Sequence, residues 1–156
     1  MPSWMHIHNE EALEEYHELY TPLNPIFYPA ILPWDTSYIT GFYDSANRRS
    51  SFVRHLVSGD DDETDVSETI DDYNFLLLCD KENELEWRQH QPGNAINEHV
   101  ATNNIGIPVY FGRVRVGYNN VIGEVREDGN CYIPTPFNDV IRVLDFEILR
   151  HRDIQQ

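Results

Sequence analysis

Residues 109–126 read VYFGRVRVGYNNVIGEVR, and this stretch decides the fold class. Its first part is rich in β-branched and aromatic residues, and two valines alternate with Arg113 and Arg115. Such alternation is typical of a strand with one buried face. The turn-forming run Gly117–Asn120 follows, and an apolar segment then returns from Val121. The stretch therefore predicts two adjacent β-strands joined by a tight turn.

The same signals recur outward from this stretch and predict an all-β fold. Further strands are expected at 131–133 and 140–149 in the second half, and at 26–32, 38–43, 51–57 and 73–78 in the first half. Pro29 either weakens the strand prediction for 26–32 or makes this an edge strand, because proline cannot donate to a strand ladder. One helix is expected at Glu10–Leu19, behind Asn9 as its cap. Its apolar face would consist of Ala12, Leu13, Tyr16 and Leu19.

An internal repeat organises these segments. Trp4 aligns with Trp87 at an offset of 83, and Gly41 aligns with Gly123 at an offset of 82. Phe75 then aligns with Phe146 at an offset of only 71, because the first copy carries an extra acidic segment. We expect two pseudo-symmetric antiparallel repeats, 1–80 and 81–156, packed as one compact unit that shares buried surface or exchanges strands. The aromatic residues expected in the core are Trp4, Trp87, Tyr28, Tyr110, Phe75 and Phe146.

The composition is strongly acidic, with 27 Asp and Glu against 11 Lys and Arg and a formal net charge of -16. This field repels nucleic acid and anionic membranes and favours a basic partner, a cation or high solubility. Residues 59–72 concentrate the acids, and we interpret them as a solvated loop. A docking arm for a basic partner and a calcium site are the alternatives, although the spacing of an EF-hand is absent.

Motifs of catalysis and cofactor binding are not found in the sequence. It has no phosphate-binding glycine loop, no dinucleotide fingerprint and no nucleophile elbow, so we predict a protein without catalysis or cofactor. His6 and His8 would lie with Trp4 on one face of an extended segment. No cysteine or third histidine stands near them, so an incidental pair is favoured and no metal site is predicted.

Two further features concern the location of the protein in the cell. The two cysteines, Cys79 and Cys131, are expected to be free thiols, because the chain carries no secretory mark. The N-terminal segment lacks the basic start and apolar region of a signal peptide, and no apolar run is long enough to span a membrane. We therefore expect a cytoplasmic protein.

The second copy resembles the DM-nine repeat family of invertebrate lectin-like proteins. The most specific matching segments are Tyr110-Phe111-Gly112-Arg113 and Cys131-Tyr132-Ile133-Pro134, and the similarity extends over roughly 87–149. The first copy resembles the same repeat in a heavily diverged form. The resemblance implies two repeats in one pseudo-symmetric all-β unit, binding of mannose-type sugars, and formation of a homodimer.

The resemblance also indicates where a sugar would bind. The family's acidic and basic sugar contacts correspond to Asn103 and Glu124, so the acid is replaced by an amide and the base by an acid. An amide and a carboxylate together still supply donors and acceptors for vicinal hydroxyls. The candidate ligand-binding residues are Asn103, Glu124, Tyr118 and Arg113. Two functions remain open: lectin-like carbohydrate binding, and an acidic protein-interaction module that has lost the sugar.

Overall fold

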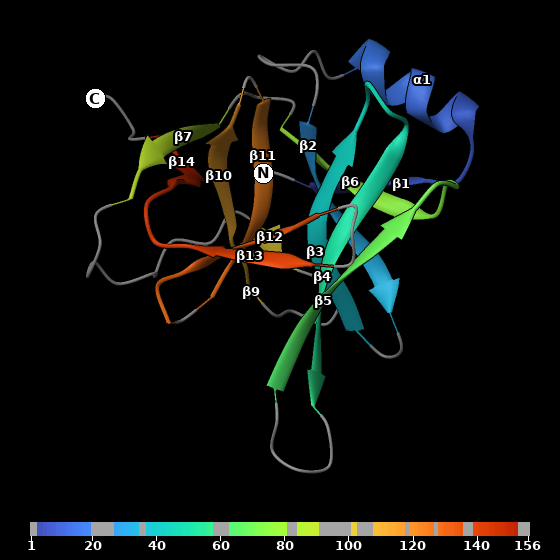
Figure 1. The fold of residues 1–156 in the computed structure, drawn as a ribbon. Helices are drawn as coiled ribbons and strands as arrows, with labels where there is room; N and C mark the ends of the chain where they lie inside the picture. The colour runs from blue at the N-terminus through green and yellow to red at the C-terminus, as the bar shows by residue number, and fades with distance from the viewer. Residues whose placement is uncertain are drawn as a thin grey trace.

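The protein is almost entirely β-structure with one short helix (Figure 1). The computed structural model describes residues 3–19, 27–34, 37–57, 63–80, 84–90, 101–102, 108–117, 119–126, 128–135 and 139–152. Twelve of the strands form two six-stranded antiparallel sheets, and two short strands form a separate pair. The all-β prediction is therefore confirmed.

The first sheet has the strand order β1-β6-β2-β3-β4-β5. Its strands are β1 (Ser3–Ile7), β2 (Phe27–Trp34), β3 (Ser37–Asp44), β4 (Arg49–Val57), β5 (Glu63–Ile70) and β6 (Phe75–Cys79). The second sheet has the order β13-β12-β11-β10-β14-β7. Its strands are β7 (Leu85–Gln89), β10 (Phe111–Val116), β11 (Asn119–Val125), β12 (Cys131–Pro134), β13 (Val140–Val143) and β14 (Glu147–His151). The separate pair is β8 (Ala101–Thr102) with β9 (Pro108–Val109).

The two sheets have the same topology, strand for strand. Read from β1 and from β7, both run through the same succession, so that β1 matches β7, β6 matches β14, and β2 to β5 match β10 to β13. The registers agree as well, because Trp4 pairs with Leu78 and Trp87 pairs with Leu149. Each sheet contains strands of its own half only, so the expected alternative of strand exchange is not seen among the described strands.

A glycine stands at the same place in each sheet because the backbones cross too closely for a side chain. A Cβ on Gly41 would lie 1.9 Å from the carbonyl oxygen of Ser51, and a Cβ on Gly123 would lie 2.2 Å from that of Tyr132. Real Cβ atoms do not approach backbone oxygens so closely. The aligned glycines of the repeat therefore have one and the same structural cause.

The buried residues form three clusters, of which one joins the two sheets. That middle cluster includes Ile31 and Phe42 from the first sheet with Ile122 and Leu149 from the second. Trp4 contacts Phe111 across it, with ring centroids 6.0 Å apart. Strands β11, β12 and β13 contact β3, β4 and β5 respectively, so these three strands each meet their own counterpart. The two repeats thus share buried surface.

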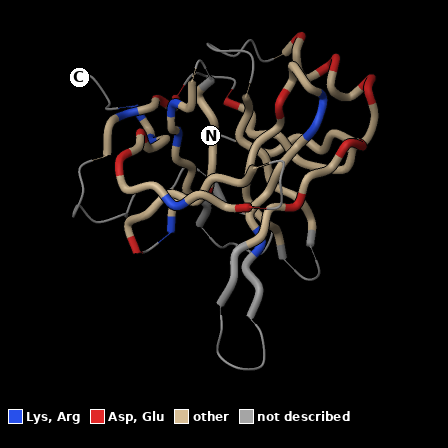
Figure 2. Tube along the Cα trace, viewed as in Figure 1, with Lys and Arg blue, Asp and Glu red and all other residues tan. Residues whose placement is uncertain are grey.

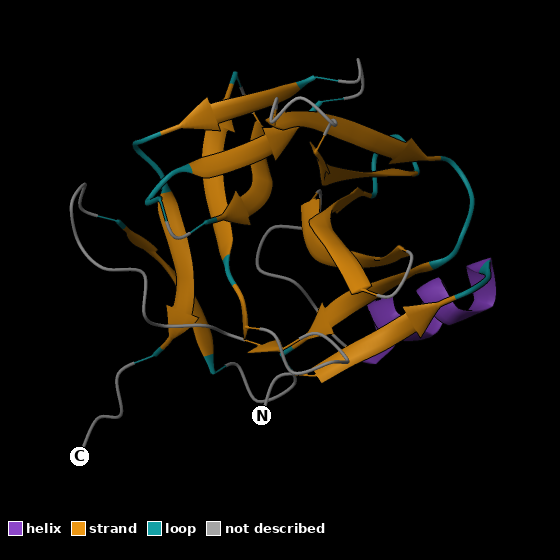
Figure 3. Cartoon of the chain, turned by 90° about the horizontal axis from the view of Figure 1, so that it is seen from below, coloured by secondary structure: helices purple, strands orange, loops and turns teal. Residues whose placement is uncertain are grey.

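The only helix described, α1 (Glu10–Leu19), covers the outer face of the first sheet (Figure 3). Asn9 caps it as expected, because the Ala12 amide donates to the Asn9 side chain at 2.8 Å. Ala12, Leu13 and Tyr16 are buried, and the Tyr16 hydroxyl donates to the Leu78 carbonyl at 2.7 Å. Leu19 is exposed, so its predicted place in the apolar face was wrong.

Two predictions about strands were wrong. Strand β2, which contains Pro29, lies between β6 and β3 rather than at an edge. Its register with β6 covers only Ala30 and Ile31, so the missing N–H of Pro29 falls outside that ladder. Residues 140–149 form two strands, β13 and β14, because the chain bends at Leu144 and Asp145. The run of 140–149 has no glycine, proline or asparagine to signal this bend, and Leu144 is in fact largely exposed.

The aromatic core was predicted only in part. Tyr28, Phe75 and Phe146 are buried as expected. Trp4, Trp87 and Tyr110 are only partly buried and pack against the edges of the clusters. Large aromatic side chains are often highly but incompletely buried, which accounts for the difference.

Candidate functional site

Two of the four candidate ligand-binding residues lie on one face of the second sheet. Glu124 on β11 is opposite Phe111 on β10, and Arg113 is opposite Ile122. Directly opposed residues of an antiparallel pair point to the same side, so Arg113 and Glu124 share the face that looks toward the first sheet. The other two candidates, Asn103 and Tyr118, lie outside the described residues.

Arg113 is held by residues of its own sheet. Its guanidinium makes a two-pronged ion pair with Glu147 on β14, because Nε donates to Oε1 at 3.1 Å and Nη2 donates to Oε2 at 3.1 Å. The same guanidinium lies over the Trp87 ring, 4.9 Å from its centroid. Such forked pairing fixes both side chains in orientation. Arg113 therefore has a structural function that was not apparent from the sequence.

Glu124 is part of a second polar network, on β11 and β12. Its carboxylate pairs with Arg126 at 3.2 Å, and the Arg126 guanidinium lies 4.1 Å from the centroid of the Tyr132 ring. The Tyr132 hydroxyl donates to Asp128. Partial burial by itself would raise the pKa of Asp128, but the hydrogen bonds from Tyr132 and Asn130 outweigh it and lower that pKa. Burial and the bond to Asp128 raise the pKa of Tyr132.

The first sheet carries apolar residues where the second carries these charges. The pair Arg113–Glu147 on β10 and β14 corresponds to the pair Ile31–Leu76 on β2 and β6. Glu124 corresponds to Phe42, which is buried between the sheets. The positions of the expected sugar contacts therefore serve packing in one repeat and internal ion pairs in the other.

The described part of the acidic segment is organised differently from the expected loop, whereas residues 59–62, which carry the Asp60–Asp62 calcium alternative, lie outside the described residues. Glu63–Ile70 forms strand β5, which pairs with β4 along its full length. Thr64, Val66, Thr69 and Ile70 are β-branched and favour a strand in spite of the intervening acids, which explains the error. Glu68 of β5 pairs with Arg54 of β4 at 2.6 Å. In the described ranges no three His, Cys, Asp or Glu side chains gather as metal ligands, so the calcium alternative gains no support from them.

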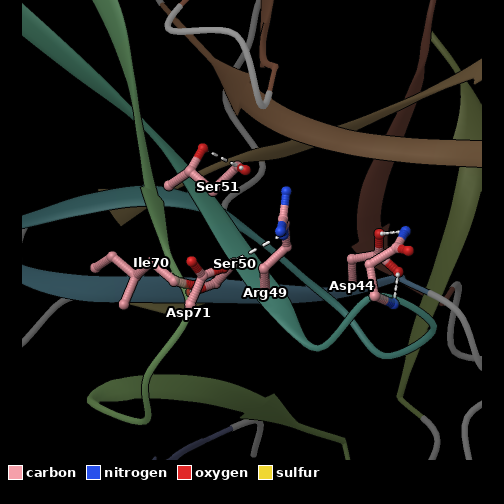
Figure 4. Close-up of polar contacts among 8 residues, drawn as sticks. Asp44, Arg49, Ser50, Ser51, Ile70 and Asp71 are labelled. Atoms are coloured by element: carbon pink, nitrogen blue, oxygen red, sulfur yellow. Dashed lines mark hydrogen bonds and ion pairs between the residues drawn. The ribbon is translucent and has the colours of Figure 1, made fainter.

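The polar groups beside β5 hold the sheet together (Figure 4). Arg49 pairs with Asp71 at 3.3 Å, and the Ser51 hydroxyl lies 3.2 Å from that of Thr69. Asp44 accepts hydrogen bonds from the Ala46 and Asn47 amides, at 3.0 and 3.3 Å, and closes the turn between β3 and β4. Each of these groups therefore joins neighbouring strands or closes a turn.

The cysteines lie in the interior of the molecule. Cys79 and Cys131 are free thiols, as expected, and both are buried. Burial, with a smaller contribution from the charge of Glu124, raises the pKa of Cys131 to about 12. A thiol with so high a pKa is a poor nucleophile at neutral pH. Cys131 is therefore a packing residue.

The charge of the chain is divided unequally between the two halves. Residues 1–80 contain three Arg against sixteen Asp and Glu, a formal charge of -13, whereas residues 81–156 contain eight Lys and Arg against eleven acids, a formal charge of -3. Figure 2 shows acids along α1, and all five of its glutamates are exposed. These are Glu10, Glu11, Glu14, Glu15 and Glu18.

The glutamates of α1 have little internal compensation. Arg48 approaches Glu10 at 3.8 Å, with both side chains mostly exposed, and such a pair contributes little. Among the described residues, no basic side chain pairs with the other four. This glutamate face was not predicted from the sequence, although it lies opposite the buried Ala12, Leu13 and Tyr16 of the predicted helix.

Comparisons with known proteins add no assignment. Neither the family models nor the curated proteins that were searched include a match to this chain. Within the described residues, no helix has the length and apolar character needed to cross a membrane.

Proposed function

We propose that this chain is a non-catalytic recognition module that binds a basic protein partner through the acidic surface of its first repeat. The observation that carries the proposal is the exposed glutamate face of α1, within a half whose formal charge is -13. A dense field of one sign attracts a partner of the opposite sign and accelerates its association.

Carbohydrate binding is supported less well by the geometry. The resemblance to lectin-like repeats favours it, but Arg113 and Glu124 already form ion pairs with Glu147 and Arg126. A sugar at these positions would have to break such pairs and leave a charge without its partner. We therefore propose the protein-interaction module as the function, on a scaffold derived from a lectin-like repeat.

The test measures binding of a lysine- and arginine-rich peptide to the purified chain by titration calorimetry. We expect binding that weakens at least about tenfold between about 0.05 and 0.5 M salt, because exposed charges are screened over roughly 10 Å at 0.1 M. A variant with Glu11, Glu14, Glu15 and Glu18 changed to Gln should bind much more weakly. The control variant loses the same charge in the second half through Glu82→Gln, Glu98→Gln, Asp139→Asn and Asp153→Asn.

Two results would contradict the proposal. The first is equal loss of affinity in the two variants, which would mean that net charge alone attracts the peptide. The second is the absence of peptide binding together with binding to a mannose-type glycan array. Glycan binding abolished by Arg113→Ile or Glu124→Phe would then establish the carbohydrate function.

A further inference from the structure

Two histidines near the start of the chain lie side by side at the surface. His6 lies two residues after Trp4 on strand β1, so the two side chains share a face. Strand β1 ends at Ile7, and His8 follows directly after it. The imidazole rings of His6 and His8 have centroids 5.5 Å apart, and both residues are exposed. They take no part in the proposed recognition of a basic partner.

The spacing of the two rings suits one tetrahedral ion. A zinc ion lies about 2.0 Å from each histidine nitrogen, in the plane of the ring, so tetrahedral angles place the two ring centroids about 5.2 Å apart. Right-angled coordination, as in a square-planar copper site, would bring the centroids to about 4.5 Å. The observed centroid distance of 5.5 Å is close to the tetrahedral value, and the two ring planes are tilted by 45° to each other.

The side chain of Asn74 contacts one ring nitrogen of His6. The His6 Nε2 atom lies 3.1 Å from Asn74 Oδ1, just before β6. An amide oxygen can only accept a hydrogen bond, so the neutral tautomer with its proton on Nε2 fits this contact and leaves the Nδ1 lone pair for a ligand. Histidines that bind metals commonly donate their second ring N–H to such an acceptor, which fixes the ring and the tautomer.

We propose that His6 and His8 form a surface site for zinc, with Asn74 as a positioning residue. The two imidazoles supply two ligands, and water completes the tetrahedron, because no larger group of ligands is assembled in the described part of the chain. The negative field of the protein raises the local concentration of divalent cations at this surface. Nitrogen ligands favour zinc over calcium or magnesium, which prefer oxygen.

The experiment titrates Zn²⁺ into the full chain, prepared without a histidine tag, by calorimetry in competition with a weak chelator. We expect one ion per chain, with affinity at least about tenfold weaker in His6→Asn and in His8→Asn. His151→Asn removes another exposed histidine, on β14, and should leave zinc affinity unchanged. Ca²⁺ titrated in place of Zn²⁺ should not compete.

Asn74 is tested by a readout that separates positioning from stability. Asn74→Ala should weaken zinc binding while the melting temperature in the presence of a chelator stays the same, and Asn74→Asp should restore affinity because a carboxylate accepts the same hydrogen bond. Failure of the wild-type chain to bind zinc at about 1 mM or below would overturn the site. Undiminished binding by the variant lacking both His6 and His8 would do so as well.

Discussion

The two sheets share a strand order but use the same face differently. In the first sheet, Ile31, Leu76 and Phe42 bring apolar groups to the contact between the repeats. In the second sheet, the matching positions hold Arg113, Glu147 and Glu124, which pair within the sheet. The backbone of a repeat therefore tolerates either chemistry at these positions, whereas both sheets require a glycine where Gly41 and Gly123 lie against a neighbouring backbone oxygen.

The largest effect is expected where the two sheets agree. Gly41→Ala and Gly123→Ala each force a Cβ against a backbone oxygen that cannot move without breaking a ladder. We expect each change to lower the free energy of unfolding by about 3 kcal/mol or more. Urea denaturation measures both. A loss in only one sheet would show that the crossing is not shared.

Exchange of one buried pair between the sheets tests their packing. Ala30 and Ser50 of the first sheet stand where Gly112 and Cys131 stand in the second, and a Cβ on Gly112 would lie 2.5 Å from the Cys131 sulfur. Gly112→Ala alone should destabilise by about 2 kcal/mol. Adding Cys131→Ser should recover about 1 kcal/mol, measured as the coupling in a double-mutant cycle. Purely additive effects would contradict the exchange.

Converting the ion pair of the second sheet to the apolar pair of the first tests the charged face. Arg113→Ile alone leaves Glu147 half-buried without its partner and should cost about 1–2 kcal/mol. Arg113→Ile with Glu147→Leu reproduces the pair Ile31–Leu76 and should return the stability close to wild type. Thermal and urea unfolding of both variants provide the measurement. A double variant less stable than the single would indicate that the second sheet requires the charges.

The two sheets also differ at one buried position, where the second sheet has a histidine. His90 stacks on Phe146 with ring centroids 4.9 Å apart, and its Nε2 has no hydrogen-bond partner within the described residues. The matching residue of the first sheet is Ile7, which is fully buried. His90→Ile should therefore raise the free energy of unfolding by about 1 kcal/mol, because it removes an unsatisfied buried group. The urea midpoint should rise with an unchanged slope; a fall would give the histidine a stabilising function.

The smallest effect concerns acid stability at the turn of the second sheet. The folded state lowers the pKa of Asp128, so its carboxylate stabilises the fold above the unfolded pKa of about 3.9 and loses this effect as the pH falls through the folded value. Asp128→Asn should lower stability by less than about 1 kcal/mol at pH 6, since the group is exposed. The difference in stability should shrink as the pH falls through the lowered pKa of Asp128 in the folded state. Tyr132→Phe removes the hydroxyl that donates to Asp128, so it should make the stability of the fold less dependent on pH in the acidic range.

The repeat could be predicted from the sequence because its offsets reflect structure. The change from 82 to 71 between Gly123 and Phe146 corresponds to the longer β4–β5 hairpin of the first repeat, part of which projects from the body in Figure 1. The predicted hairpin around Gly117 is confirmed, and its glycine has a φ of 63°. Local signals sufficed wherever turns carried glycine or clustered polar residues.

The errors have a common origin in tertiary context. Leu144 is not a turn-forming residue, so the bend after β13 was not predicted. The acids of β5 favoured a loop prediction in spite of its β-branched residues. The ion pair of Arg113 was not apparent from the sequence for a related reason, because its partner Glu147 lies 34 residues away. Only the pairing of β10 with β14 brings the two together.

The unequal charge of the two halves makes the molecule electrostatically asymmetric. A body with -13 on one half and -3 on the other carries an electric dipole as well as a net charge. In the field of a cationic surface, the molecule would rotate before contact, so that α1 and the first sheet face that surface. Recognition would then begin with orientation at a distance, and the second repeat would remain turned toward the solvent.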